Sequence, residues 1–177
     1  IHVIGNSRSA VVGASSVARE LGYVVHVIEE PVVGEARLAS RRLVEIAARM
    51  AGIDGPPVCI LAAGETTVRV TGTGKGGRNQ ECALAMARGL AALGTNAVAA
   101  SIGTDGVDGP TDAAGGVVDS TTVTRALAAG LGPPEPYLED NNSYVILDGL
   151  GDLIRTGPTD TNVGDLQIIL LGGRTEG

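Results

Sequence analysis

The chain must build its hydrophobic core without phenylalanine or tryptophan, because neither occurs among its 177 residues and only three residues are tyrosine. Hydrophobic residues still make up 44% of the sequence, so the core has to consist of valine, isoleucine, leucine and alanine. A chain of this length buries roughly 70% of its unfolded surface and needs no stabilising cross-links. Short valine and isoleucine runs are typical of strands covered by helices, so the composition favours an α/β fold.

Strands and helices are predicted to alternate along the first third of the chain. Residues 1–4 and 24–28 are apolar runs typical of strands, and residues 7–21 and 34–50 have helical spacing that ends at a glycine. Further strands are expected at 58–63, 67–71, 97–102, 117–118 and 166–171, and further helices at 79–93, 121–131 and 143–150. We therefore predict an α/β protein with a layered, mainly parallel sheet and helices on both faces. Residues 67–71, after a tight turn at Gly64 and Glu65, are the expected antiparallel exception.

The charge and composition exclude several classes of partner. The net charge is −7, and no basic stripe or aromatic platform suited to nucleic acid is present. No run of 18 apolar residues predicts a membrane span, and no signal peptide opens the chain. Cys59 and Cys82 lie in apolar runs without metal-ligand spacing and are expected to be reduced core thiols. We therefore expect a cytoplasmic protein that binds a small molecule.

The first candidate site is the glycine-rich segment from Thr71 to Glu81, Thr-Gly-Thr-Gly-Lys-Gly-Gly-Arg-Asn-Gln-Glu. Glycines permit a positive φ and let backbone N–H groups face an anion, and the following helix N-terminus adds partial positive charge. Lys75 and Arg78 add full positive charges, so the segment predicts a phosphate or carboxylate site. The alternatives are a structural turn, and an Arg78 side chain that merely pairs with Glu81 on the helix surface. The segment lacks the spacing of a P-loop. Gly72, Gly74 and Gly77 match the glycines of the dinucleotide fingerprint, but the next acidic residues, Asp105 and Asp108, come later than that fingerprint requires.

The second candidate site is the loop at 103–116, which follows a predicted buried strand and carries Asp105, Asp108 and Asp112. Ligands of open α/β sheets bind beyond the carboxyl ends of strands. Three crowded carboxylates repel each other unless a cation or hydrogen-bond donors intervene, and oxygen ligands suit Mg²⁺ held jointly with phosphates. The alternative is that these residues cap local turns. A third polar loop, 157–165, precedes the last strand and alone predicts an ordinary turn.

These segments resemble the glycerate 2-kinase family, whose C-terminal module is called MOFRL. The resemblance rests on the glycine-rich string, on Gly-Thr-Asp-Gly-Val-Asp-Gly-Pro-Thr-Asp-Ala-Ala-Gly at 103–115, and on Gly-Pro-Thr-Asp-Thr-Asn-Val at 157–163. It covers about 57–172, beyond a linker at 54–57, while residues 1–53 resemble the tail end of, or the junction to, a preceding α/β domain. One departure is Asn142, where members usually carry aspartate.

The resemblance implies the C-terminal part of a two-domain enzyme that uses ATP and Mg²⁺ to convert D-glycerate to 2-phosphoglycerate. Such a fragment is expected to be inactive without the N-terminal domain, and it could associate as a homodimer. The catalytic candidates are Arg78 and Asp105, and the metal candidates are Asp105 and Asp112. The phosphate- or substrate-binding candidates are Gly74, Lys75, Gly76, Gly77, Asn79, Gln80, Glu81, Thr104, Asp108, Thr111 and Asn162. The alternatives are an NAD(P)H-dependent hydroxypyruvate reductase and a non-catalytic anion-binding module.

Overall fold

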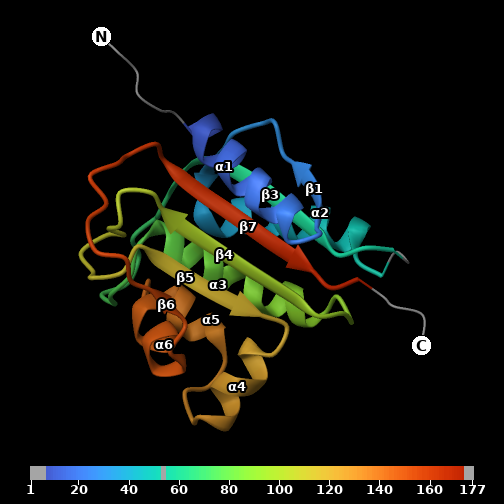
Figure 1. The fold of residues 1–177 in the computed structure, drawn as a ribbon. Coiled ribbons are helices and arrows are strands. Elements are labelled where there is room, and N and C mark those ends of the chain that lie inside the picture. Colours follow the sequence, from blue (N-terminus) through green and yellow to red (C-terminus); the bar gives the residue numbers. More distant parts are fainter. Residues whose placement is uncertain (1–6, 53–54, 174–177) are drawn as a thin grey trace.

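The computed structural model describes residues 7–52 and 55–173, so the strand predicted at 1–4 and part of the predicted linker lie outside the described residues (Figure 1). A seven-stranded sheet has the order β1-β3-β7-β4-β5-β6, and β2 also pairs with β3. The strands are β1 (Val24–Val27), β2 (Val32–Glu35), β3 (Val58–Thr67), β4 (Ala97–Gly103), β5 (Gly115–Asp119), β6 (Leu153–Ile154) and β7 (Asp165–Leu171). The helices are α1 (Ser7–Glu20), α2 (Ala36–Met50), α3 (Arg78–Ala91), α4 (Thr122–Ala128), α5 (Pro134–Glu139) and α6 (Ser143–Leu150).

The α/β class is confirmed, but the sheet is mixed and the expectation of mainly parallel strands is wrong. β1 and β2 run parallel to β3, whereas β7 runs antiparallel to both β3 and β4, and β4, β5 and β6 alternate in direction. β3 and β4 share one direction through the crossover helix α3, but the last strand inserts between them. The acidic loop joins β4 to β5 without a helix, and such a short connection favours an antiparallel pair.

β3 is longer than predicted, because the chain continues as a strand through Gly64 and Glu65 instead of turning. The predicted turn and the separate antiparallel strand at 67–71 are therefore wrong. Gly64 is required by the neighbouring strand: a Cβ atom there would lie 2.1 Å from the carbonyl oxygen of Val32 in β2. β2 itself was not predicted, and α2 accordingly begins at Ala36 rather than at residue 34.

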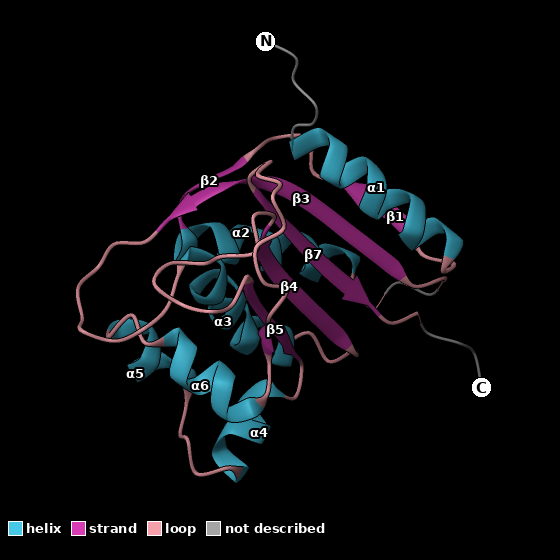
Figure 2. Cartoon of the chain, turned by 60° about the vertical axis from the view of Figure 1, so that its left-hand side comes forward, coloured by secondary structure: helices cyan, strands magenta, loops and turns pink. Residues whose placement is uncertain are grey.

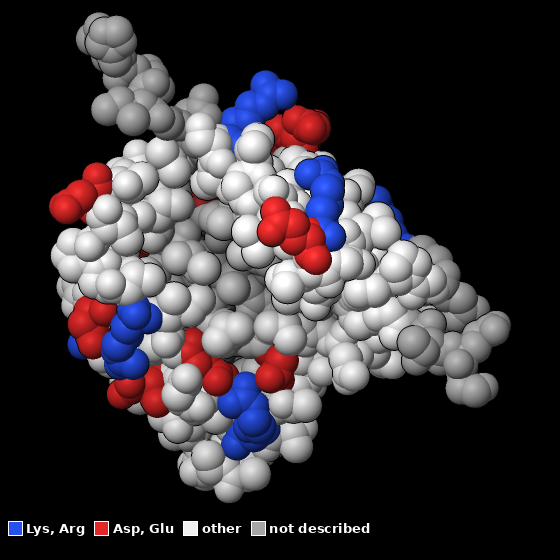
Figure 3. Space-filling view, in the orientation of Figure 1, with Lys and Arg blue, Asp and Glu red and all other residues white. Residues whose placement is uncertain are grey.

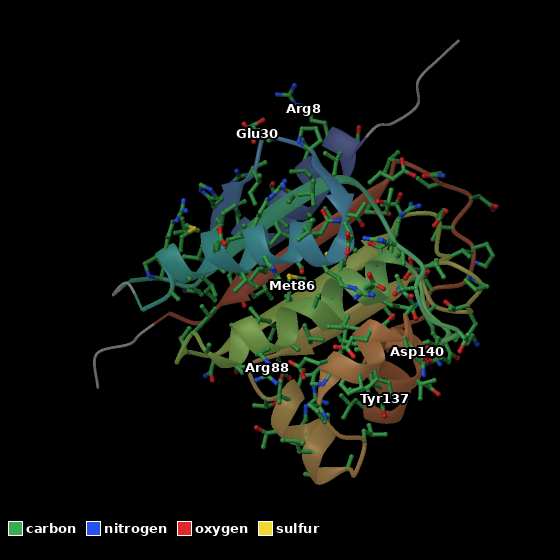
Figure 4. All side chains as sticks on the ribbon, turned by 180° about the vertical axis from the view of Figure 1, so that it is seen from behind. Arg8, Glu30, Met86, Arg88, Tyr137 and Asp140 are labelled. Carbon is green, nitrogen blue, oxygen red and sulfur yellow. The ribbon has the colours of Figure 1, made fainter. Side chains whose placement is uncertain are left out.

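Helices cover both faces of the sheet, as predicted. α1 packs on one face, where Val11 and Ala18 meet Cys59 and Leu61 of β3. α2 and α3 pack on the other face over the larger core, with α4, α5 and α6 beyond α3 (Figure 2). Figure 4 shows Met86 of α3 on the side that faces α2. Both cysteines are buried and free, as expected. The largest buried apolar side chains are all aliphatic: Ile60, Leu61, Leu84, Met86, Leu90, Ile146, Leu147, Ile169 and Leu171.

The segment before residue 53 shares the sheet with the later residues, because β1 and β2 pair with β3. The domain boundary at 53–57 stays a prediction. No helix within 7–52 and 55–173 is long and apolar enough to cross a membrane. On the face shown in Figure 3, basic side chains lie beside acidic ones rather than in a basic patch.

The close approach of β2 to Gly64 generates a stability prediction. Gly64→Ala should lower the free energy of unfolding by about 1–3 kcal/mol, because the added methyl group overlaps the Val32 backbone. Gly13→Ala is the control: Gly13 lies in α1 with no atom within 4 Å of the added methyl, so alanine should stabilise the helix by about 0.5–1 kcal/mol. Urea unfolding of the three proteins measures both effects. Equal stability of Gly64→Ala and the parent would contradict the β2–β3 pairing.

Candidate functional site

An open cavity of about 680 Å³ lies where β3 ends and α3 begins. Its walls come from three segments: the end of β3 with the residues after it, the glycine-rich segment, and the acidic loop after β4. The lining residues are Thr66, Thr67, Val68, Val70, Gly74, Gly76, Gly77, Arg78, Glu81, Asp105, Val107, Asp108, Gly109, Pro110 and Asn141. The cavity thus brings the two sequence-predicted segments together.

The backbone N–H groups of residues 71–75 bind the turn between α5 and α6 rather than facing the cavity. Figure 4 shows Asp140 of this turn beside the chain that leads into α3. The side chains of Asp140, Asn141 and Asn142 all serve as acceptors. The bonds run from Thr71 N and Gly72 N to Asn141 Oδ1 (2.7 and 2.9 Å), from Thr73 N to Asp140 Oδ1 (2.8 Å), from Gly74 N to Asp140 O (2.9 Å) and from Lys75 N to Asn142 Oδ1 (3.0 Å). These five amides are therefore occupied, contrary to the expectation that they face an anion.

The four glycines of this segment are required by close neighbours and not by a positive φ, since none of them has one. A Cβ atom on Gly72 would lie 2.4 Å from the Asp140 backbone, and one on Gly76 would lie 2.4 Å from Ser143 Oγ. At Gly77 the added atom would meet the Asp108 carboxylate at 2.4 Å. The segment is glycine-rich because two other parts of the chain pack directly on its backbone.

Asp108 occupies the N-terminus of α3. Its two carboxylate oxygens accept hydrogen bonds from Asn79 N (3.0 Å) and Gln80 N (2.8 Å), and its side chain is buried. Burial raises the pKa of Asp108, and the hydrogen bonds from Asn79 and Gln80 oppose that shift. The anion at this helix N-terminus is therefore supplied by the acidic loop itself, which matches the turn-capping alternative for this residue.

Arg78 forms a two-pronged ion pair with Asp165 at the start of β7. Its Nε lies 2.8 Å from Asp165 Oδ2 and its Nη2 lies 2.9 Å from Asp165 Oδ1. Its third nitrogen, Nη1, lies 3.4 Å from Oε1 of the exposed Glu65. The hydrogen bond with Asp165 raises the pKa of Arg78, which keeps the guanidinium charged.

Arg78 does not pair with Glu81, so the surface-pair alternative is wrong. Glu81 is buried, and its carboxylate accepts hydrogen bonds from Arg37 Nε of α2 (2.9 Å) and Asn141 Nδ2 (3.0 Å). Asn141 also donates to Arg69 O at 3.1 Å. Glu81 therefore ties α2, α3 and the α5–α6 turn together.

The two candidate metal ligands have different surroundings. Asp105 is half-buried on the cavity wall, and its Oδ1 accepts a hydrogen bond from Val107 N at 3.1 Å. Asp112 is exposed, and hydrogen bonds from the Tyr144 hydroxyl (2.7 Å) and Arg155 Nε (2.9 Å) lower its pKa to about 2. Within the described parts of the chain, no three His, Cys, Asp or Glu side chains gather as a metal site.

The remaining candidates lie behind or beside the cavity wall. Lys75 is exposed, with its Nζ 3.8 Å from the centre of the Tyr144 ring. Thr104 Oγ1 donates to Gly164 O at 2.7 Å, and the Asn162 side chain accepts a bond from Gly164 N at 3.2 Å. Behind the wall, Asn79 is bound by Ser101, and Gln80 donates to Thr111 Oγ1.

The sequence analysis missed Asp165, Arg37 and the acceptor role of residues 140–142. One available signal was the position of Asp165, because it begins an apolar strand in the alternating set that includes Ile169 and Leu171. A carboxylate in a core-facing position needs a partner of opposite charge, so this position predicts that an arginine lies next to Asp165.

Comparisons with known proteins identify the family of this chain. The model of the MOFRL family matches residues 58–165. The D-glycerate 2-kinase of Thermotoga maritima is 44% identical over 97% of this chain and 41% of its own length, and the glycerate 2-kinase of Pyrococcus horikoshii is 40% identical over 90% and 37%. A protein of Agrobacterium vitis named putative hydroxypyruvate reductase is 36% identical over 97% of this chain and 40% of its own length.

The crystal structure of the Thermotoga maritima glycerate kinase superposes with a TM-score of 0.90, covering 97% of this chain and 42% of that one. This chain thus spans about two fifths of the length of the relatives it matches. The family model covers well over half of the 177 residues, and the solved relative has the same fold throughout the shared region. The chain belongs to the MOFRL family, as its sequence motifs indicated.

Proposed function

We propose that this chain forms part of an ATP-dependent glycerate 2-kinase, which transfers the γ-phosphoryl group of ATP to the 2-hydroxyl of D-glycerate and yields 2-phosphoglycerate. The proposal is carried by one observation: the cavity at the start of α3 has Arg78 and Asp105 on its wall in a chain that is 44% identical to a D-glycerate 2-kinase. Because that relative is more than twice as long, the rest of the site would come from further residues of a longer polypeptide. This chain alone should be inactive.

We also place the enzyme in the cytoplasm, where buried thiols stay reduced.

Arg78 would stabilise the transferring phosphoryl group. Phosphoryl transfer requires positioning and charge stabilisation more than covalent chemistry from the protein. Arg78 has a fixed edge on Asp165 and a partly solvent-exposed edge whose other partner is the surface residue Glu65. An exposed ion pair of this kind contributes little, so an incoming phosphate can take the place of Glu65.

The lining of the cavity has more acidic than basic side chains, which supports a requirement for a bound cation. Among the described lining residues Arg78 is the one basic side chain, whereas Glu81, Asp105 and Asp108 are acidic. ATP and glycerate are both anions, so a divalent cation would offset their repulsion from these carboxylates. Asp105 fits this task, because it lies on the wall while Asp108 caps α3, and Mg²⁺ binds through one or two carboxylates together with substrate phosphates. When bound, the cation would supply charge stabilisation at the phosphates.

Two other functions give different results in the same assay. A hydroxypyruvate reductase, the name carried by the Agrobacterium vitis relative, would oxidise NAD(P)H. An anion-binding module would bind phosphate without turnover. Incubation of the longer protein with D-glycerate, ATP and Mg²⁺ should release ADP and 2-phosphoglycerate, identified by ³¹P NMR. NAD(P)H consumption with hydroxypyruvate and no ATP-dependent product would refute the proposal.

Arg78→Lys should reduce kcat/KM of the longer enzyme at least about tenfold, roughly 1.4 kcal/mol of transition-state stabilisation. A lysine cannot hold Asp165 with two parallel bonds while also presenting a donor to the cavity. Arg125→Lys is the matched control, because Arg125 makes a similar two-pronged pair with Asp152 and does not line the cavity. Steady-state kinetics that are normal for Arg78→Lys would remove this arginine from the site.

Asp105→Asn should lower kcat by about 10²–10³ while leaving the protein folded, if this carboxylate holds the cation or orients the acceptor hydroxyl. The asparagine oxygen can still accept the hydrogen bond from Val107 N, so the loop should keep its shape. Asp148→Asn, an exposed change on α6, controls for loss of a negative charge. The decisive measurement is kcat beside the thermal midpoint. A lowered midpoint with normal kcat would assign Asp105 to turn capping instead.

A further inference from the structure

We infer that Asp165 is a positioning residue, which fixes the plane of the Arg78 guanidinium so that Nη1 faces the cavity. This inference rests on the proposed function, because it concerns how the chain orients the group that would bind the transferring phosphate. It adds a residue from the third polar loop, which the sequence motifs do not connect with Arg78.

The Asp165 carboxylate is completely buried and surrounded by donors. Besides the bonds from Arg78, Asp165 Oδ1 accepts a hydrogen bond from Asn79 Nδ2 at 3.0 Å, and Oδ2 accepts one from Thr66 N at 3.4 Å. Asn79 is held in turn by Ser101 Oγ, which donates to its Oδ1 at 2.6 Å. Donors from two elements, α3 and β3, therefore prevent the carboxylate from rotating.

The backbone of Asp165 is held as firmly as its side chain. It pairs with Gly64 of β3 on one side and Gly103 of β4 on the other, in the middle of the sheet. A Cβ atom on Gly103 would lie 3.4 Å from Asn79 Nδ2, so the missing side chain leaves room for Asn79 beside the carboxylate. The partner of Arg78 is thus a buried side chain on a residue that is paired on both sides in the sheet.

The nitrogens of the Arg78 guanidinium therefore have different roles. The edge formed by Nε and Nη2 is bound to Asp165. Among the ion pairs of the described residues, Nη1 takes part only in the one with the exposed Glu65. A side chain that is about one-third exposed and held along one edge can offer donors to a ligand without losing its orientation.

The Arg125–Asp152 pair provides a matched control within the same chain. Arg125 also binds its aspartate with two nitrogens, at 3.1 and 2.7 Å, and the side-chain exposures are 36% and 12%, against 32% and 0% for Arg78 and Asp165. Neither Arg125 nor Asp152 lines the cavity. Loss of either aspartate should cost stability, but only Asp165 should affect turnover.

The test is a double-mutant cycle in the longer enzyme, at a temperature where circular dichroism shows every variant folded. Asp165→Asn should lower kcat at least about tenfold, whereas Asp152→Asn should leave it within about twofold. In an Arg78→Ala background, Asp165→Asn should cause no further loss of kcat, because Asp165 acts through Arg78. Losses that multiply in the double variant, or an unchanged kcat for Asp165→Asn, would overturn the inference. If Asp165→Asn does not fold, Asp165→Glu enters the same cycle, since it keeps the charge but displaces the guanidinium.

A binding measurement separates this inference from the proposed function. Calorimetric titration of tripolyphosphate into the same four proteins measures its affinity for each. Asp165→Asn should weaken tripolyphosphate binding when Arg78 is present and should have no further effect in the Arg78→Ala background. An active wild-type enzyme with independent effects in both cycles would refute the positioning role alone. A wild-type protein without kinase activity, but with coupled effects on tripolyphosphate affinity, would refute the kinase and retain the positioning role.

Discussion

The insertion of β7 between β3 and β4 is the constraint on which the rest of the structure depends. It pairs with β3 and β4, which lie much earlier in the chain, through two antiparallel ladders that extend from Gly64↔Asp165 to Val58↔Leu171 and from Gly103↔Asp165 to Ala97↔Leu171. Without it, β3 and β4 would each lack a partner on the side that faces the centre of the sheet, and α3 would have no continuous surface to cover. Non-local pairings of this kind form slowly, because the loop-closure entropy must be overcome before the contacts stabilise the chain. The same insertion carries Asp165 to the start of α3.

The walls of the cavity are held by side chains that satisfy backbone groups. Acceptors from 140–142 bind the glycine-rich segment, and Asp108 binds the first amides of α3. Each hydrogen bond contributes only about 1 kcal/mol, but together they fix a segment that has little regular structure of its own. The glycine-rich segment is therefore preorganised, so little conformational entropy is lost when a ligand binds to it.

The sequence could predict the elements that have a strong period. Residues 79–93 and 97–102 correspond closely to α3 and β4, since apolar periodicity reports which residues are buried. Periodicity does not show which strands pair with each other. The position of β7 between β3 and β4, and the mixture of parallel and antiparallel strands, were therefore not predictable from it. Gly64 was wrongly predicted to form a turn. The sequence does not distinguish a glycine that allows a neighbouring strand to approach closely from a glycine that forms a turn.

For the site, the structure brings the two motif segments to one cavity, but the motifs do not show which of their side chains are bound by other residues. Arg78 and Asp105 lie on the cavity wall, whereas Asp108 caps a helix and Asp112 has surface partners. The partners of the glycine-rich amides lie about seventy residues away, and Asp165 lies 87 residues from Arg78. Such contacts follow from the topology of the sheet and have no local signal.

The Arg37–Glu81 pair has a consequence for the MOFRL module as a unit. The family match begins at residue 58, so it includes Glu81 but excludes Arg37, β1 and β2. A module cut at that point would retain Glu81 facing the surface once covered by α2, without its cation, and would expose the edge of β3. Losing one partner of a buried ion pair typically costs about 3–5 kcal/mol, a large part of the stability of a small domain. The residues that the family model matches and the residues that complete the sheet and the Glu81 ion pair are therefore not the same set, because the second set includes β1, β2 and Arg37.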